Sequence, residues 1–354
     1  MKSSRQIFIR NLDELKAHLI FVESEKRLFG IAVSNEKASP VEAELFAVAK
    51  QLGAGISKKR FDYNSVIVAL YGFFEQFVEG LLKGYLRGLT RTSSCYDDIP
   101  EVVRGNHVEV TAGMFKVFDL PKYRGIVTPE NLTANLHSCF TNQPIFNLNI
   151  EAFAHHSANF RTGVVDQFFL KVGIKNISQR ANQLQFLQEV SSKCDPSLIG
   201  FDPEKNTIFA VDDLAERRNE VAHGSESEIL SNDILRDYIL LLEAYGESLY
   251  EIVWSEALAF EVRLRGKELG ETLIIHNHSI VCINVTIKNT SVKKGDVLVA
   301  LLESGPLSAV GGEISSIGID KQMIEAITCL ESMNLAFEVD FRGKKKQSFK
   351  LLTR

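Results

Sequence analysis

The chain has 354 residues, of which 45% are hydrophobic and 24% are charged. These proportions are typical of a globular protein, and the length suits two domains better than one. The net charge of −5 excludes a basic field over the whole molecule, so nucleic acid would have to bind at a local basic patch.

The cysteines and the hydropathy pattern indicate the cellular compartment of the protein. The five cysteines are scattered and form no Cys-x-x-Cys pair, which argues against a zinc site or a disulfide framework and for a reducing compartment. No uninterrupted apolar run approaches the roughly 20 residues of a membrane span. The first twelve residues lack the apolar core of a signal peptide. We therefore expect a cytoplasmic protein without membrane contact.

Residues 1–255 show the periodicity of amphipathic helices. Apolar residues recur every three or four positions between Val66 and Tyr85, and again between Ile229 and Ile252 in a long final helix. Pro196, Gly200 and Pro203 predict a loop over residues 191–206. Residues 92–127 and 141–160 are ambiguous. Further helices are expected at residues 11–31, 40–50, 129–139, 162–171 and 178–192.

The sequence Arg218-Asn219-Glu220-Val221-Ala222-His223 ends a predicted helix that Asp212 or Asp213 could cap. Gly224 follows at once and is the residue expected in the left-handed conformation after a helix. His223 lies in the last turn, where the helix dipole favours the imidazolium form. A His can transfer a proton and an Arg can hold a phosphate, which are the two tasks of metal-free RNA cleavage.

The spacing of this motif poses a geometric problem. On an ideal helix Arg218 and His223 point about 140° apart, whereas Asn219 and His223 share a face. Either the long Arg218 side chain reaches around the helix, or the two groups act across an interface between chains.

The motif resembles the Arg-x(4–6)-His signature of HEPN domains, an all-α superfamily of mostly prokaryotic RNA-cleaving and nucleotide-binding modules. The upstream Phe-rich helix around Tyr71–Phe77 and the apolar helix after Gly224 strengthen the likeness, which covers residues 60–255. The chain is similar to the larger prokaryotic branch found in restriction and phage-defence gene neighbourhoods. The resemblance implies a homodimer in which both copies of the motif line one cleft. It also implies prokaryotic defence or a toxin–antitoxin system, with an antitoxin or a defence partner protein.

The resemblance implies a role for each polar residue of the motif. His223 would act as general base or acid, Arg218 would stabilise charge on the phosphorane, and Asn219 would orient the His or the phosphate. Glu75 is an acidic companion in the Phe-rich helix, or else a solvent-facing Glu. Arg217, beside the motif, is a candidate for substrate binding.

This chemistry needs no metal and no cofactor, and its requirement for a 2′-hydroxyl predicts RNA, with tRNA or ribosome-associated RNA among the candidates. The leading function is thus a metal-independent endoribonuclease. The alternative is a non-catalytic HEPN dimerisation or binding scaffold whose β region acts as a sensor or adaptor. A nucleotide-binding regulator is less well supported, because the chain has neither a GxxxxGK[ST] nor a GxGxxG motif.

Two pairs of histidines lie outside the motif. His155 and His156 are adjacent, so they point apart in any regular element, and no Cys or carboxylate stands beside them at metal-ligand spacing. His276 and His278 could share a strand face, which is more often a polar strand end than a pair of metal ligands. We therefore expect no metal site.

From about residue 258 the hydrophobic period changes to two. Phe260, Val262 and Leu264 alternate with charged residues and predict a strand, and residues 335–341 and 349–351 predict a hairpin. Turn glycines between them fit a small β-barrel of roughly 95 residues. The expected fold is therefore a multidomain α and β protein. An all-α HEPN helical bundle at 1–255 precedes a small all-β, barrel-like recognition domain at 258–354.

Parts of the β region are similar to the second β-barrel domain of translational GTPases. The likeness rests on a Gly-Asp turn within Lys293–Val299, a strand at Gly312–Asp320 and an apolar strand at Leu335–Phe337. It implies a recognition module for tRNA, the ribosome or a protein partner. The last hairpin gathers basic residues that could contact phosphates, or could serve only as solubilising edge charges. These residues are Arg342, Lys344, Lys345, Lys346 and Lys350.

Overall fold

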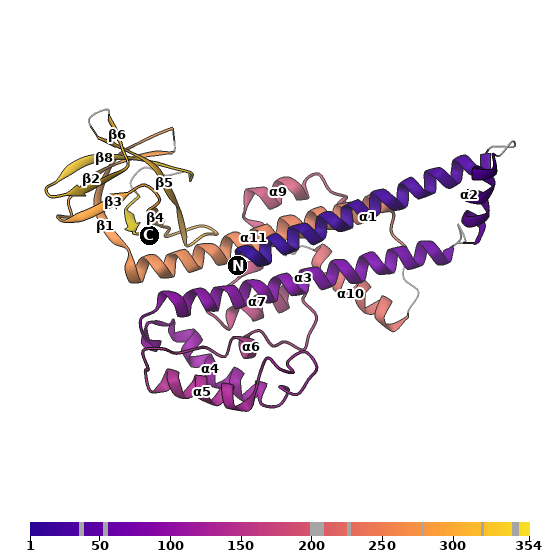
Figure 1. The fold of residues 1–354 in the computed structure, drawn as a ribbon, viewed down its shortest axis with the longest axis horizontal. Helices are drawn as coiled ribbons and strands as arrows, with labels where there is room; N and C mark the ends of the chain where they lie inside the picture. The colour runs from indigo at the N-terminus through magenta and orange to yellow at the C-terminus, as the bar shows by residue number, and fades with distance from the viewer. Residues whose placement is uncertain are drawn as a thin grey trace. The chain divides into compact units, whose positions relative to one another are not determined.

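The computed structural model describes residues 1–34, 39–51, 56–198, 209–224, 228–277, 279–319, 322–341 and 347–354. It confirms the predicted class, because helices occupy the chain up to Arg265 and strands occupy the remainder (Figure 1). The chain forms two compact units. The first holds Met1–Leu82, His156–Leu170 and Lys175–Tyr250, and the second holds Lys83–His155, Lys171–Ile174 and Glu251–Arg354.

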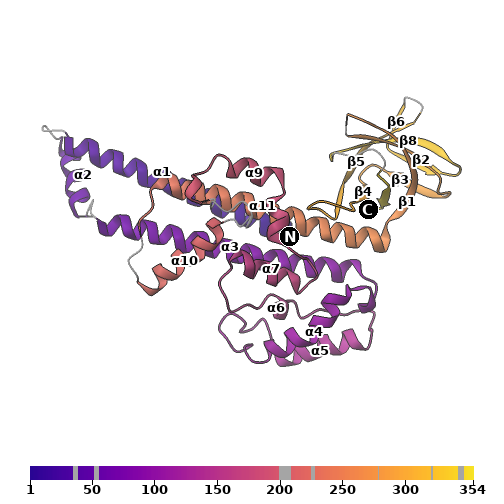
Figure 2. The same ribbon diagram turned by 180° about the vertical axis from the view of Figure 1, so that it is seen from behind.

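Three long helices form the frame of the first unit: α1 (Lys2–Ser34), α3 (Ile56–Thr92) up to Leu82, and α11 (Asn232–Arg265) up to Tyr250. Figures 1 and 2 both show them side by side. The Phe8 ring of α1 stacks on Phe77 of α3, with 4.3 Å between ring centroids. A Cβ at Gly246 of α11 would lie 2.5 Å from the Phe8 ring, so only glycine permits this close approach.

Shorter helices complete the first unit. They are α2 (Pro40–Gln51), α7 (Thr162–Leu170), α8 (Ile177–Asn182), α9 (Gln185–Ser191), the 3-10 turn η2 (Pro196–Leu198) and α10 (Phe209–His223). The helices predicted near 40–50 and 162–171 are confirmed. The single helix predicted at 178–192 is wrong, because Leu184 is extended, with ψ 127°, and begins a second helix. Part of the loop predicted at 191–206 lies outside the described residues.

Helix α3 is the apolar core helix of the first unit. Its Lys58–Thr92 segment is long and apolar enough to cross a membrane by length and composition alone. Its side chains Phe74, Val78 and Leu81, however, are fully buried among the other helices. Core helices of globular proteins pass the same hydropathy test, so a single such helix is weak evidence for a membrane span.

The second unit contains the turn η1 (Tyr96–Asp98) and the helices α4 (Glu101–Met114), α5 (Pro129–Phe140) and α6 (Ile150–Phe153). The helix predicted at 129–139 is confirmed, with Thr128 accepting the Asn131 amide as its cap. A fully buried histidine, His107 on α4, joins these elements. Its Nε2 accepts the Asn149 amide at 3.0 Å, and its Nδ1 lies 3.2 Å from the Tyr96 hydroxyl.

His107 makes folding sensitive to acid. Burial lowers its pKa from 6.5 to about 4, so the unfolded chain binds the proton first as the pH falls. The contribution of the neutral ring is fully present above pH 6.5 and is lost as the pH falls toward 4. Because of this group, we expect the free energy of unfolding, measured with urea, to be about 2 kcal/mol lower at pH 5 than at pH 7.5. In His107→Gln the free energy of unfolding should fall by about 2 kcal/mol less between these two pH values. If it falls equally in the variant and the native chain, His107 is not the group responsible.

The second unit ends in a β-barrel. Six of the described strands close a ring in the order β4-β9-β1-β2-β8-β5, with β5 pairing back to β4, and β6 extends the sheet beside β5. β3 and β7 form a separate pair. Alternate residues of β2 and β8, among them Val281, Ile283 and Phe337, fill the interior. The bounds are β1 (Lys267–His276), β2 (Ile280–Val285), β3 (Thr290–Lys293), β4 (Val297–Leu301), β5 (Ala309–Ile319), β6 (Gln322–Ile324), β7 (Ala326–Cys329), β8 (Met333–Val339) and β9 (Phe349–Leu352).

Two predictions about the β region are wrong. The strand expected from residue 258 is the end of α11, where Leu258, Ala259 and Val262 lie on one helical face and pack against the barrel. The first strand begins only at Lys267. The expected hairpin also does not form, because β8 pairs with β2 and β5 whereas β9 pairs with β1 and β4.

Candidate functional site

Helix α10 carries the motif Arg218-Asn219-x3-His223 and ends where the sequence predicts. Gly224 follows with φ +69°, which confirms the left-handed residue after the helix. The helix begins by Phe209, however, so Asp212 and Asp213 lie within it and do not cap it. Asp212 instead accepts the Thr162 amide at 2.7 Å and so fixes the start of α7 to α10.

Arg218 is oriented by its neighbours. Its guanidinium carbon lies 5.2 Å from the centre of the Tyr71 ring on α3, within cation–π range, and its Nη1 donates to Asn219 Oδ1 at 3.2 Å. The same Asn219 oxygen accepts the amide of Asn159 at 2.5 Å. Asn219 therefore positions Arg218. The role expected for it, orienting the His or the phosphate, stays a prediction.

The Tyr71 ring is itself held in place. Its hydroxyl accepts the backbone N–H of Phe160 at 2.8 Å. Burial first, and then the charge of Glu75, raise the pKa of Tyr71 to about 12, so the hydroxyl stays neutral at physiological pH. The Arg218 guanidinium is thus supported by a buried, neutral aromatic face. Within the described part of the chain, Arg218 has no carboxylate partner in an ion pair.

Arg217 differs from its neighbour Arg218. Its guanidinium pairs with Asp213 at 2.7 Å, and it also donates to the Tyr63 hydroxyl at 3.1 Å and to the Glu228 carbonyl at 3.3 Å. The Tyr238 hydroxyl donates to the same Asp213 carboxylate. These contacts favour a structural role that ties α10 to α3 and α11. Substrate binding by Arg217 stays a prediction.

His223 lies at the exposed end of α10. The helix is unbroken from Arg218 to His223, so the two side chains keep the divergence of about 140° expected from the spacing. Among the residues described, His223 makes no hydrogen bond or ion pair. Its imidazole is therefore exposed to solvent, whereas Arg218 lies against α3.

A cluster of Glu75, Glu79 and His156 could not be seen in the sequence. Glu75 and Glu79 lie one turn apart on α3, and both face His156, whose Nε2 lies 2.9 Å from Glu79 Oε1 and 3.5 Å from Glu75 Oε1. Glu75 therefore contacts a histidine and is not a purely solvent-facing residue. The sequence shows only that Glu75 and Glu79, four positions apart, lie on the same face of one helix. The folding of a distant segment brings His156 beside them.

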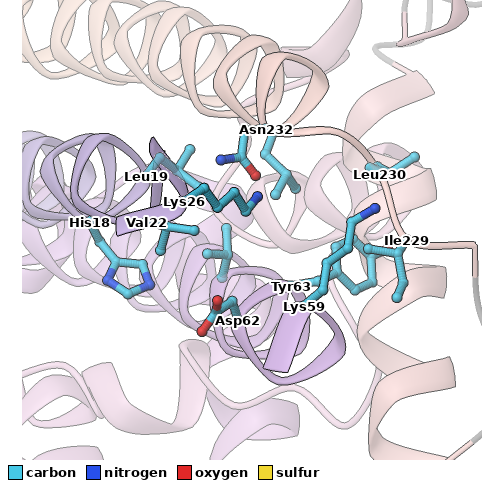
Figure 3. A pocket seen from close by; sticks show the side chains of 12 residues that line it. His18, Leu19, Val22, Lys26, Lys59, Asp62, Tyr63, Ile229, Leu230 and Asn232 are labelled. Atoms are coloured by element: carbon cyan, nitrogen blue, oxygen red, sulfur yellow. The ribbon is translucent and has the colours of Figure 1, made fainter. Parts of the chain in front are cut away.

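A small pocket lies beside the Arg217 contacts. It has a volume of about 20 Å³, enough for one water molecule, and its lining includes Tyr63, the acceptor of the Arg217 hydrogen bond. Figure 3 shows the exposed side chains of Lys26 and Lys59 among apolar neighbours such as Val22. The pocket includes neither Arg218 nor His223, and it is too small for a nucleotide.

The remaining candidates add little to this site. Lys344, Lys345 and Lys346 fall outside the described residues, as does His278. Lys350 is described, and its amine pairs with Glu268 at 3.2 Å across β9 and β1. Phosphate binding by the lysine cluster stays a prediction.

An all-α unit with Arg218 and His223 on one helix, close to a long Phe-rich core helix, is the arrangement expected of a HEPN-class protein. The family model described as RiboL-PSP-HEPN matches residues 41–255, which is more than half of the chain. The protein therefore belongs to the RiboL-PSP-HEPN family, as its sequence resemblance indicates. The match ends at residue 255, so it lends no support to the likeness between the barrel and translational GTPases.

Other comparisons add no argument. No curated protein matches the chain. Among solved structures, a flavohemoglobin from Malassezia yamatoensis with bound FAD and heme is 9% identical. The alignment covers 76% of this chain and 64% of that one, with a TM-score of 0.13. The chain thus spans less than two thirds of that protein, and a likeness with such a TM-score says nothing of the fold or the function.

Proposed function

We propose that this protein is a HEPN-type endoribonuclease in which Arg218 binds the scissile phosphate and His223 transfers protons. One observation carries the proposal. The Arg218 guanidinium is held by Tyr71 and Asn219, yet within the described residues it has no carboxylate partner. A preoriented guanidinium without a counter-ion suits the bidentate binding of a phosphate. The neighbouring Arg217, in contrast, already pairs with the carboxylate of Asp213.

The chemistry follows from the two groups. One His223 accepts the proton of the RNA 2′-hydroxyl, whose oxygen then forms a bond to the adjacent phosphorus. Arg218 stabilises the negative charge that develops on the phosphorane oxygens. The bond from phosphorus to the 5′-oxygen breaks, the leaving oxygen takes a proton from water, and the imidazolium returns its proton to the resulting hydroxide. The products are a 2′,3′-cyclic phosphate and a 5′-hydroxyl.

The divergence of Arg218 and His223 on α10 supports a site shared between two copies of the chain. In a twofold dimer the same helix from each copy faces its symmetry mate, so two Arg218 and two His223 side chains meet in one cleft. Each copy would then supply the His223 that its partner's site lacks, so the dimer holds two shared sites.

The biological setting is a broader part of the proposal. The family resemblance supports prokaryotic defence or a toxin–antitoxin system, with an antitoxin or a defence partner. The five cysteines, all free, fit a cytoplasmic protein. The barrel is the natural module for recognising the RNA, with tRNA and ribosome-associated RNA as candidates, or for recognising a partner protein.

The test is cleavage of a mixed pool of total RNA and tRNA in EDTA, beside DNA of matched sequence. We expect the native chain to cut RNA alone, because DNA lacks the attacking 2′-hydroxyl, and to leave 2′,3′-cyclic phosphate ends. Arg218→Ala and His223→Ala serve as the inactive variants. A folded native protein that cuts no RNA, or that cuts DNA equally well, would contradict the proposal. The first of these results would leave a non-catalytic scaffold as the better interpretation.

A further inference from the structure

We propose that Glu75, Glu79 and His156 hold a divalent transition-metal ion. The two carboxylates lie one turn apart on α3, and the imidazole comes from the segment between α6 and α7. Each residue offers one ligand atom, and the three atoms lie within 4.8 Å of one another. Carboxylate oxygens and imidazole nitrogens are both ligands that such ions take in proteins.

The hydrogen bonding of His156 leaves a place for a cation between these groups. Its Nδ1 lies 2.9 Å from the Ala158 carbonyl, which only accepts hydrogen bonds, so Nδ1 carries the proton. In the neutral ring the Nε2 lone pair then points at Glu79 Oε1, 2.9 Å away, and two acceptors face each other. A metal ion on Nε2 resolves this conflict, and a histidine that ligates a metal commonly donates its other N–H to a backbone carbonyl.

The distances also suit a shared ion. Two ligand atoms that are each about 2.1 Å from one ion lie about 3.0–3.4 Å apart at angles of 90–109°. The separations of 2.9 Å and 3.5 Å from His156 Nε2 to the two carboxylates are close to that interval. The Glu75 side chain is 32% exposed, so it has room to turn and complete the coordination.

The surroundings of His156 make the site rigid on one side. Its side chain is only 9% exposed, with the Phe160 ring centre 4.3 Å away and the Phe168 ring edge-on at 5.8 Å. Among the common ions, this ligand set favours Zn²⁺ or Mn²⁺, because Mg²⁺ and Ca²⁺ prefer oxygen ligands alone. Three protein ligands leave at least one position for water.

The ion would hold the segment that positions Arg218. Three residues beyond His156, Asn159 donates to Asn219, and Phe160 donates its N–H to Tyr71. A metal that ties His156 to α3 would fix this segment against the helix that carries Tyr71. We therefore assign the ion a structural role, separate from the proton transfers proposed for His223. This inference does not rest on ribonuclease activity.

The test is titration calorimetry of the chelator-treated full chain with Zn²⁺, with Mn²⁺ and with Mg²⁺. We expect one equivalent of Zn²⁺ or Mn²⁺ to bind and to raise the Tm, with Mg²⁺ much weaker. Glu75→Gln and His156→Gln should each weaken binding at least about tenfold, the loss typical of removing a residue that a metal site depends on. Circular dichroism establishes that each variant is folded.

A matched control is Glu216→Gln, which changes an exposed glutamate that pairs with Arg161 at 3.3 Å and is not one of the three ligands. It should bind the ion as the native chain does. Stoichiometric binding that Glu75→Gln and Glu216→Gln share would overturn the proposal, as would a native chain that binds neither ion. His156 would then be an imidazolium held between two carboxylates. Metal binding is read by calorimetry, whereas RNA cleavage in EDTA reports on the metal-free chain, so failure of one proposal can be told from failure of the other.

Discussion

A one-to-one mixture of the Arg218→Ala and His223→Ala variants, each inactive alone, is expected to recover about a quarter of native RNA cleavage. Random pairing makes half of the dimers mixed, and one of the two shared sites in each mixed dimer keeps both native groups. The physical reason is the helical spacing of α10, which turns Arg218 and His223 about 140° apart within one chain. The measurement is the initial rate of cleavage after subunit exchange.

The control for this experiment is a mixture of Arg218→Ala with the double variant Arg218→Ala/His223→Ala. It contains no site with both native groups, so it should stay inactive. Formation of mixed dimers is established by two different affinity tags. If verified mixed dimers of the single variants are as inactive as their parents, the two groups do not act across a twofold interface.

Replacement of Arg217 by Met is expected to lower the free energy of unfolding by about 3 kcal/mol. The substitution leaves the Asp213 carboxylate, whose side chain is 16% exposed, without its ion-pair partner. It also removes the donor to the Tyr63 hydroxyl on α3. Arg218→Met is the matched control, and we expect it to change stability by less than about 1 kcal/mol, because Arg218 has no ion pair among the described residues.

Urea unfolding followed by circular dichroism measures both effects. Asp213→Asn in the Arg217→Met background should restore part of the lost stability, because it removes the uncompensated charge. The opposite pattern would identify Arg217 as a substrate contact: a stable Arg217→Met variant with weakened RNA binding. That pattern would support the role predicted for Arg217 from sequence alone.

The strongest periodic patterns predicted the helices well, and they failed where two periods coincide. The apolar residues from Val66 to Tyr85 form one face of α3 as expected, because a long series of apolar residues at this spacing fits a helix and not a strand. At residues 258–265 the alternation of Phe260, Val262 and Leu264 suggests a strand. Leu258, Ala259 and Val262 share a helical face over the same residues, and the continuing helix α11 decides between the two patterns.

Neither the strand pairing nor the cluster of Glu75, Glu79 and His156 could be inferred from local sequence. β8 and β9 are neighbours in sequence, yet closure of the barrel gives each of them other partners. The carboxylate of Glu79 and the imidazole of His156 are separated by 77 positions in sequence, so no spacing rule along the chain connects them. The motif on α10 could be recognised because Arg218 and His223 lie on one helix and Gly224 follows it directly. The contacts of Arg217, in contrast, come from α3 and α11 as well.

The most direct test of the central claim is the rate of cleavage at one mapped RNA site in EDTA, for the native chain, Arg218→Ala and His223→Ala. The claim is that these two side chains cleave RNA. We expect each substitution to lower the rate by about 10²–10⁴-fold, the usual contribution of a positioned acid–base or charge-stabilising group, without lowering the Tm. Native rates in both variants, with the RNA still cut at the same site, would contradict the account.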